Sequence, residues 1–437
     1  MSHKSTEALI DTLTTHWLSL RTQAPKDLHH IRIDGTFNGP LSNMLSAPSD
    51  RRVYWQSRDG QTESVGVGAV MEVTTSRPED IPGLWDRMET AGQQGDTPTR
   101  FFGGTAFDTQ QAPDAVWQPM GLMRFWVPHV MLLREKDHTH LVVSTTTLDD
   151  SALAQAVQCV KSTLQAQANP SQALPVSHRC DVEPTLSQWQ KRVTAVTQDL
   201  AEAQGKLVLS VRRSHRLSGR LEALQLFQRM QSQGGGGFQY YFQVDDNAFM
   251  GVSPECLYER QVTHLATEAL AGTAKLDSGL LDNPKENCEH DFVIRDMQEA
   301  LASVCSEFVC QPNKELLKWQ DLVHLKTALT GTLKAGVTDA QIIQALHPSA
   351  AVLGYPRDKA WQWLHAYEDH ARGWYAGPVG WLERDRAQFA VALRCAIVAS
   401  NQIHFYAGAG LVPASRPLEE WQEVQNKMRF FQEILEG

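Results

Sequence analysis

The sequence predicts a mixed α/β fold with largely antiparallel strands, and three observations support this prediction. Short apolar runs separated by turns occupy the first part of the chain, at residues 53–55, 65–71, 123–133 and 141–144. Such runs are typical of strands joined by tight connections in an antiparallel sheet. The second part combines alternating strand patterns with long amphipathic segments that begin at helix-capping signals. The chain is therefore expected to contain both sheets and helices.

The composition is that of a globular protein with an anionic balance. Of the 437 residues, 42% are apolar and 21% charged, and the formal net charge is -10. This charge argues against nucleic-acid binding through overall charge, so an anionic substrate would have to be met by local cations or a metal. The N-terminal segment is too polar for a signal peptide, and no apolar run approaches the roughly 20 residues of a membrane helix. Seven cysteines without CxxC spacing predict free thiols in a reducing compartment, and we expect a cytoplasmic protein.

In the first part, helices are expected at residues 5–21 and 151–167, the second after Asp150 as N-cap. Residues 167–184 contain three prolines and little periodicity, which indicates a linker or surface crossing. We divide the chain there into 1–180 and 181–437 for description. Four glycines at 234–237 lack the Lys-Ser/Thr of a phosphate-binding P-loop, so a flexible turn before a strand at 239–244 is favoured.

Alternation predicts three strands in the second part. Residues 206–212 place Lys206 on the same face as Val208. Residues 388–399 read as one continuous strand, in which Arg394 lies alone among alanines on one face. A lone arginine among small residues suggests open space in which an anion could bind. A further strand at 402–407 runs into the glycines of an AGAG motif.

Two helices of the second part begin at prolines, Pro284 after the natural N-cap Asn283, and Pro417. Each presents two carboxylates on one face of its first turns, because residues three apart share a helix face. The four are Glu286, Glu289, Glu420 and Glu423. Brought opposite each other they would form an all-oxygen site suited to magnesium, although the helix dipole alone also favours acidic residues there. Lys427 lies one turn after Glu423, where an ordinary ion pair is an equally simple explanation.

Residues 190–437 resemble the chorismate-utilising enzymes, which include isochorismate, anthranilate, aminodeoxychorismate and salicylate synthases. The resemblance rests on nine blocks in the family's order: KLVLS (206–210), GVSPECL (251–257), TEALAGT (267–273), KENCEHDFVIRD (285–296), HLKTALTG (324–331), LHPSAAVLG (346–354), YAGPVGW (375–381), ALRCAIV (392–398) and FYAGAGLVPASRPLEEWQEVQNK (405–427). It implies two stacked, largely antiparallel β-sheets flanked by helices, with the site at one edge and residues 1–180 in the same body. The chain is most similar to isochorismate synthases of the menaquinone type.

The resemblance also implies roles for the matching residues. Glu289 and Glu423 would bind Mg²⁺ directly, Glu286 and Glu420 would support through water, and the metal would hold the ring carboxylate of chorismate. Residues expected to bind the substrate are Gly272, Thr273, His324, Tyr375, Arg394, Gly408 and Lys427. Among these, Arg394 and Tyr375 would clamp the pyruvyl carboxylate, for which an arginine fork is well suited. A purely structural role for His324 is equally compatible with the sequence.

The reaction type depends on a smaller set. Lys206 aligns with the general base that activates water in isochorismate and salicylate synthases, and ammonia-using relatives lack it. To act, this lysine must be neutral, so burial or a nearby cation would have to lower its pKa from about 10.4. Glu255 matches the general acid that protonates the departing C4 hydroxyl. Ala271 stands where aminodeoxychorismate synthases carry a covalent lysine, and Glu268 belongs to a form of the motif typical of isochorismate synthases.

We therefore expect an isochorismate synthase, and two rivals remain. A salicylate synthase would use the same base and metal and then eliminate pyruvate, whereas a non-catalytic homologue would only bind chorismate. Anthranilate synthase is disfavoured by Lys206, and no amidotransferase subunit is expected. We expect a monomer. The segment at residues 274–284 is shorter than in siderophore-pathway members, which could alter how the site is covered.

Overall fold

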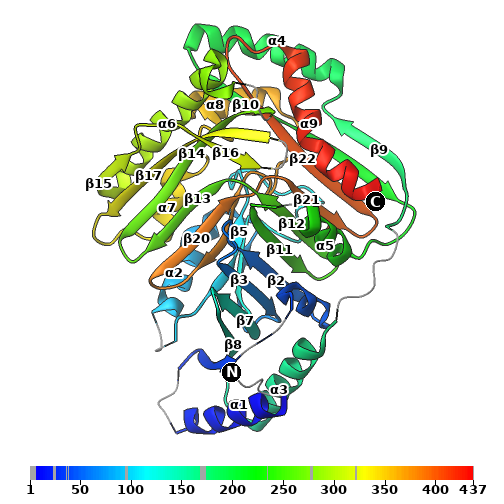
Figure 1. The fold of residues 1–437 in the computed structure, drawn as a ribbon, viewed down its shortest axis with the longest axis vertical. Coiled ribbons are helices and arrows are strands. Elements are labelled where there is room, and N and C mark those ends of the chain that lie inside the picture. The colour runs from blue at the N-terminus through cyan, green and yellow to red at the C-terminus, as the bar shows by residue number, and fades with distance from the viewer. Residues whose placement is uncertain are drawn as a thin grey trace.

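Two antiparallel sheets form the centre of the molecule in the computed structural model, and helices lie on their outer faces (Figure 1). The structure describes residues 6–22, 26–35, 37, 39–93, 97–167, 174–233, 235–275, 279–319 and 322–436. The expected architecture of two stacked sheets flanked by helices is confirmed. Part of the shortened segment, residues 276–278, and Gly234 of the glycine run lie outside the described residues.

The first sheet has the order β1-β8-β7-β3-β2-β11-β12-β21-β22-β10-β18, with β9 also paired to β10. Its strands are β1 His29–Gly35, β2 Arg51–Gln56, β3 Thr62–Val67, β7 Val130–Glu135, β8 His138–Thr145, β9 Ser177–Glu183, β10 Lys206–Leu217, β11 Phe238–Val244, β12 Asn247–Ser253, β18 Gly354–Tyr355, β21 Cys395–Ala399 and β22 Gln402–Leu411.

The second sheet has the order β15-β17-β14-β13-β20-β19-β5-β6-β4, with β16 also paired to β17. Its strands are β4 Met71–Thr75, β5 Phe101–Thr105, β6 Met123–Val127, β13 Cys256–Gln261, β14 His264–Lys275, β15 Cys305–Cys310, β16 Glu315–Trp319, β17 Leu322–Leu333, β19 Pro378–Leu382 and β20 Arg386–Val391.

Nine α-helices are described around the sheets: α1 Thr6–Leu20, α2 Ile81–Gly92, α3 Asp150–Gln165, α4 Leu186–Ala203, α5 Ala223–Gln233, α6 Pro284–Val304, α7 Asp339–Leu346, α8 Arg357–Tyr367 and α9 Pro417–Glu436. Helix α9 lies along β22, whereas α6 packs on β14 of the other sheet (Figure 1). Their N-terminal turns are thereby brought to the same end of the sandwich. Within the described residues, no helix is long and apolar enough to cross a membrane.

Alternation within the strands divides the core into two layers. In β2, Trp55 points into the layer between the sheets, while Tyr54 belongs to a second apolar cluster under the outer helices. Trp126 of the second sheet meets Phe242 of the first edge to face, with ring centroids 5.8 Å apart. The space between the sheets is therefore filled with aromatic side chains, which fixes the spacing of the two layers.

Three details differ from the sequence predictions. The strand expected at 388–399 is two strands in different sheets, and Arg394 lies between them with a left-handed φ of 44°. The chain crosses between the sheets here, and a pattern of alternating side chains cannot show a crossing. The N-cap of α3 is Asp149, whose side chain accepts from Ala152 N, so the helix begins at Asp150. Part of the expected linker forms β9, and residues 168–173 are outside the described part.

Candidate active site

A cavity with about 720 Å³ of empty space, partly open to solvent, lies where β10 and β22 meet β14, β17 and the first turns of α6 and α9. Ten of the thirteen predicted site residues line it: Glu255, Gly272, Thr273, Glu289, His324, Tyr375, Arg394, Gly408, Glu423 and Lys427. The other three, Lys206, Glu286 and Glu420, are buried beside it. The structure therefore brings together residues that are more than 200 positions apart in the chain.

Lys206, the predicted base, is fully buried at the start of β10. Its Nζ lies 3.0 Å from Oε1 of Glu289, which comes from α6. Gly410 on the neighbouring strand β22 makes room for this pair, because a Cβ there would lie 2.1 Å from Glu289 Oε1 and 3.1 Å from Lys206 Cε. The Glu289 carboxylate and the Lys206 amine nitrogen are thus held together against bare backbone.

Glu255, the predicted acid, lies between β12 and β13, where the chain passes from one sheet to the other. Its side chain is buried and lines the cavity. Burial and the negative charge of Glu268 raise the pKa of Glu255 to about 8, against the opposing effects of Lys206, Lys427 and Arg58. The carboxyl group is therefore protonated at neutral pH and can donate a proton.

The first turn of α6 forms as the sequence predicts. Asn283 Oδ1 accepts from the backbone N–H of Lys285 at 3.0 Å and of Glu286 at 3.3 Å. Glu286 in turn accepts from Thr273 N at 3.0 Å. Gly272, with φ of 72°, has Glu286 Oε2 3.1 Å from the position of a Cβ. The backbone of β14 can therefore approach this carboxylate closely.

The remaining carboxylates are paired with lysines. Glu420 is fully buried, and its Oε1 lies 2.6 Å from Lys285 Nζ. Glu423 Oε1 lies 2.6 Å from Lys427 Nζ, which also donates to Gly408 O at 3.0 Å. The contact of Lys285 with Glu420 was not predicted from the sequence, although Lys285 is the first residue of the KENCE block.

The donor set fits a hard divalent cation. Burial and the negative charges of Glu289 and Glu423 raise the pKa of Glu286 to about 7, because like charges disfavour its ionised form. All the donors are oxygens, which Mg²⁺ prefers, and a cation would relieve their repulsion. Among the described residues, no three His, Cys, Asp or Glu side chains are already arranged around a common point as metal ligands. The lysine partners would have to yield to a metal bound here.

The cavity is also lined by an arginine and by aromatic groups. Arg394 is buried, and burial lowers its pKa to about 10, so it remains charged at neutral pH. Tyr375 stacks on Tyr406 with ring centroids 5.2 Å apart. Tyr406 also lines the cavity but was not predicted, although it lies within the FYAGAG block. A buried arginine that interacts with the Tyr375 hydroxyl is suited to bind a carboxylate.

His324 of β17 is oriented by β14. Its Nδ1 lies 3.1 Å from Thr273 Oγ1 and 3.3 Å from Gly272 O. Because a carbonyl can only accept, Nδ1 carries the hydrogen in the latter contact. Burial lowers the pKa of His324 to about 3, so the ring is neutral. Its Nε2 has no partner within the described part of the chain and can accept a hydrogen bond from a ligand hydroxyl.

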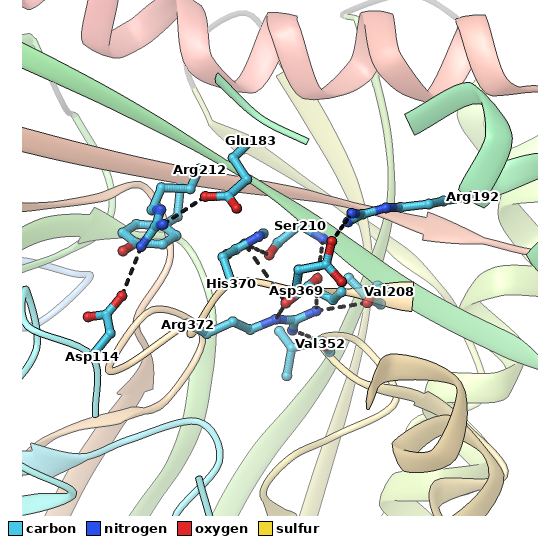
Figure 2. Close-up of polar contacts among 12 residues, drawn as sticks. Asp114, Glu183, Arg192, Val208, Ser210, Arg212, Val352, Asp369, His370 and Arg372 are labelled. Atoms are coloured by element: carbon cyan, nitrogen blue, oxygen red, sulfur yellow. Dashed lines mark hydrogen bonds and ion pairs between the residues drawn. The ribbon is translucent and has the colours of Figure 1, made fainter. Parts of the chain in front are cut away.

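An ion pair behind the cavity holds the strand that carries Lys206 (Figure 2). Arg372 donates to Glu368 at 2.5 and 2.9 Å, to Val208 O at 2.8 Å and to Val352 O at 2.8 Å. Glu368 also accepts from Ser210 N at 2.7 Å. Among the described strands, β18 pairs only with the first two residues of β10 and β9 pairs from Arg212 onward. The ion pair therefore satisfies the strand edge between them, while Val208 and Val352 line the cavity.

Comparison with known proteins agrees with this geometry. The family model described as chorismate binding enzyme matches residues 31–436. The isochorismate synthase MenF of Bacillus subtilis (strain 168) is 25% identical over 407 residues, covering 86% of each chain. Isochorismate synthase MenF of Escherichia coli (strain K12) is 28% identical over 413 residues, covering 91% of this chain and 90% of the relative.

Solved structures share the fold. The menaquinone-specific isochorismate synthase MenF from Escherichia coli superposes with a TM-score of 0.84 at 24% identity, covering 99% of this chain and 100% of that one. Anthranilate synthase component I from Streptococcus pneumoniae TIGR4 gives a TM-score of 0.72 at 19% identity, covering 84% and 91%. With the match over residues 31–436, the chain belongs to the family of chorismate-binding enzymes.

Proposed function

We propose that the protein is an isochorismate synthase that uses Mg²⁺ and converts chorismate to isochorismate. The observation that carries this proposal is that one cavity is lined by Glu255, which is protonated at neutral pH, and has Lys206 buried beside it. One group can accept a proton and the other can donate one, as the exchange of a ring hydroxyl requires. Relatives that span most of this chain are isochorismate synthases.

In the proposed reaction, Lys206 accepts a proton from the water that forms a new C–O bond at C2. Both ring double bonds shift, the C4–O bond breaks, and Glu255 donates its proton to the departing oxygen. One water enters and one leaves, so substrate and product are isomers. Hydroxide is a poor leaving group, and a positioned acid typically contributes roughly 10²–10⁴-fold.

The remaining residues orient the substrate. Arg394 and Tyr375 would hold the pyruvyl carboxylate, and His324 would accept from a ring hydroxyl. Glu289 and Glu423, supported by Glu286 and Glu420, would hold Mg²⁺. When bound, the ion would neutralise the ring carboxylate. Lys427, between Glu423 and the carbonyl of Gly408, lies beside that position.

The nucleophile we propose is water and not ammonia or a lysine. Ala271 lines the cavity and offers no amine for covalent attack on the ring. Menaquinone synthesis is the pathway we propose, because the Escherichia coli protein of the same fold is described as menaquinone-specific. We also propose that the protein is a monomer that acts without an amidotransferase subunit. We place it in the cytoplasm, because all seven cysteines are free thiols, as is usual in a reducing compartment.

Incubation of the purified protein with chorismate and Mg²⁺, followed by HPLC and mass analysis, tests this proposal. We expect a product isobaric with chorismate. Salicylate plus pyruvate would move the assignment to a salicylate synthase, which shares the base and the metal site. Thermal stabilisation by chorismate without turnover would identify a binding protein and contradict the proposed activity.

A further inference from the structure

Arg58 lies in the turn between β2 and β3 of the first sheet. Its side chain reaches the chain segment that carries Glu255, the proposed acid. Its guanidinium forms a fork with Glu268 of β14, with Nη1 2.5 Å from Oε1 and Nη2 2.8 Å from Oε2. The side chain of Glu268 is 4% exposed and that of Arg58 is 23% exposed. A bidentate, largely buried pair of this kind has a single geometry.

The pair also contacts the backbone on both sides of Glu255. Arg58 Nη1 donates to Pro254 O at 2.8 Å, and Glu268 Oε1 accepts from Cys256 N at 3.0 Å. Residues 254 and 256 are the immediate neighbours of the proposed acid, at the point where the chain crosses between the sheets. Movement of either partner would therefore move the Glu255 carboxyl relative to the substrate.

We propose that Arg58 and Glu268 form a positioning pair that holds the backbone on both sides of Glu255 and fixes the electrostatic field at its carboxyl. This inference rests on the proposed function for the role of Glu255 as acid. It gives residues 1–180 a part in the chemistry, which their sequence did not reveal.

The field at Glu255 comes from groups on several elements. Glu268 of β14 disfavours its charged form, while three basic side chains favour it: Lys206 of β10, Lys427 of α9 and Arg58 of the turn. The adjacent Cys256 is a buried thiol. Removing one member of the Arg58–Glu268 pair leaves the charge of the other uncompensated, so the two removals act on Glu255 in opposite directions.

Opposed shifts in the pH dependence of kcat test this inference. In Glu268→Gln, the charge of Arg58 remains without its partner, and Glu255 should ionise more readily. The fall of kcat at high pH (the alkaline limb) should therefore move to lower pH by roughly half a unit or more. In Arg58→Ala, the remaining anion should move the limb to higher pH, and kcat should fall on the order of 10- to 100-fold with KM nearly unchanged. Arg58→Lys keeps the positive charge but cannot form both hydrogen bonds to Glu268. The alkaline limb of its kcat profile should therefore stay near that of the wild type, and its kcat should be intermediate between those of the wild type and Arg58→Ala.

Arg77→Ala is the matched control, because Arg77 lies in the same part of the chain but pairs with Asp80 at the surface. Its pH profile should be that of the wild type. An alkaline limb that stays in place in both Glu268→Gln and Arg58→Ala, or moves in the same direction in both, would overturn the inference.

A titration of Glu255 that does not require turnover tests this inference independently of the proposed function. The carboxyl ¹³C resonance of Glu255, assigned by its absence in Glu255→Gln, should titrate with the same opposed shifts in the Mg²⁺-loaded proteins. A wild type that does not convert chorismate would contradict the proposed function, while this titration would still decide whether the pair sets the field. A Glu255 titration in Glu268→Gln that is identical to that of the wild type would overturn the inference, even where Arg58→Ala does not fold.

Discussion

Glu255 is a carboxyl group whose environment decides its chemical role. Burial and Glu268 raise its pKa to about 8, so the proton needed for catalysis is present below that pH and lost above it. We predict that kcat falls about tenfold per unit as the pH rises beyond about 8. Glu255→Gln should lose roughly 10²–10⁴-fold in kcat together with this limb. A wild-type profile that stays flat to well above pH 8 would contradict the acid role.

Lys206 is the residue on which water chemistry depends. Lys206→Ala should abolish measurable turnover, because it removes the group that we propose accepts the proton from water. The binding groups remain, so chorismate with Mg²⁺ should still raise the melting temperature. Lys161→Ala, at an exposed position of α3, is the control and should behave as the wild type. Wild-type rates in Lys206→Ala would remove this residue from the mechanism.

At the scale of elements, the first turns of α6 and α9 supply the carboxylates that we propose bind Mg²⁺. Glu423→Gln should weaken the apparent affinity for Mg²⁺ roughly tenfold or more, as measured by titrating the metal against rate and against melting temperature. Glu419 belongs to the same helix but is exposed and pairs with Arg416, so Glu419→Gln should leave the titration unchanged. Equal titrations in the two variants would contradict the ligand assignment.

The edge of β10 depends on the ion pair between Arg372 and Glu368. Although burial opposes its charge, Arg372 holds the pKa of Glu368 at about 2. Arg372→Ala should lower the free energy of unfolding by about 3–5 kcal/mol, because it leaves a buried carboxylate without its cation. Arg192→Ala, which removes the more exposed pair with Asp369, should cost less than about 1 kcal/mol in the same urea titration (Figure 2). Similar losses would show that the buried pair does not hold the strand.

Local signals predicted the elements that begin or alternate cleanly. Asn283 and Pro284 identified the start of α6 to the residue, because capping is a local hydrogen-bond pattern. The crossing at Arg394 could not be predicted, since both halves of residues 388–399 alternate in the same way whichever sheet they join. The position of Arg394 at the cavity was predicted correctly, although the single strand expected to carry it was wrong.

At the scale of the whole molecule, both sheets contain strands from both parts of the chain. β2 pairs with β11, and β5 pairs with β19. The family resemblance covered residues 190–437, so no role for Arg58 could be predicted. Arg58 lies in a turn whose only sequence signal is its glycine. Its partner Glu268 is 210 positions away, and only the packed sheets bring the two together. Contacts of this kind depend on the tertiary fold and leave no periodic pattern in the sequence.

The most direct test of water as the nucleophile is the reaction of chorismate with the Mg²⁺-loaded protein in H₂¹⁸O, with and without ammonium, with early products identified by HPLC and mass. We predict a product heavier than chorismate by the difference between one oxygen-18 and one oxygen-16, formed at the same rate without ammonium. An isobaric product without the heavy oxygen, or an aminated product that requires ammonium, would contradict the role proposed for Lys206.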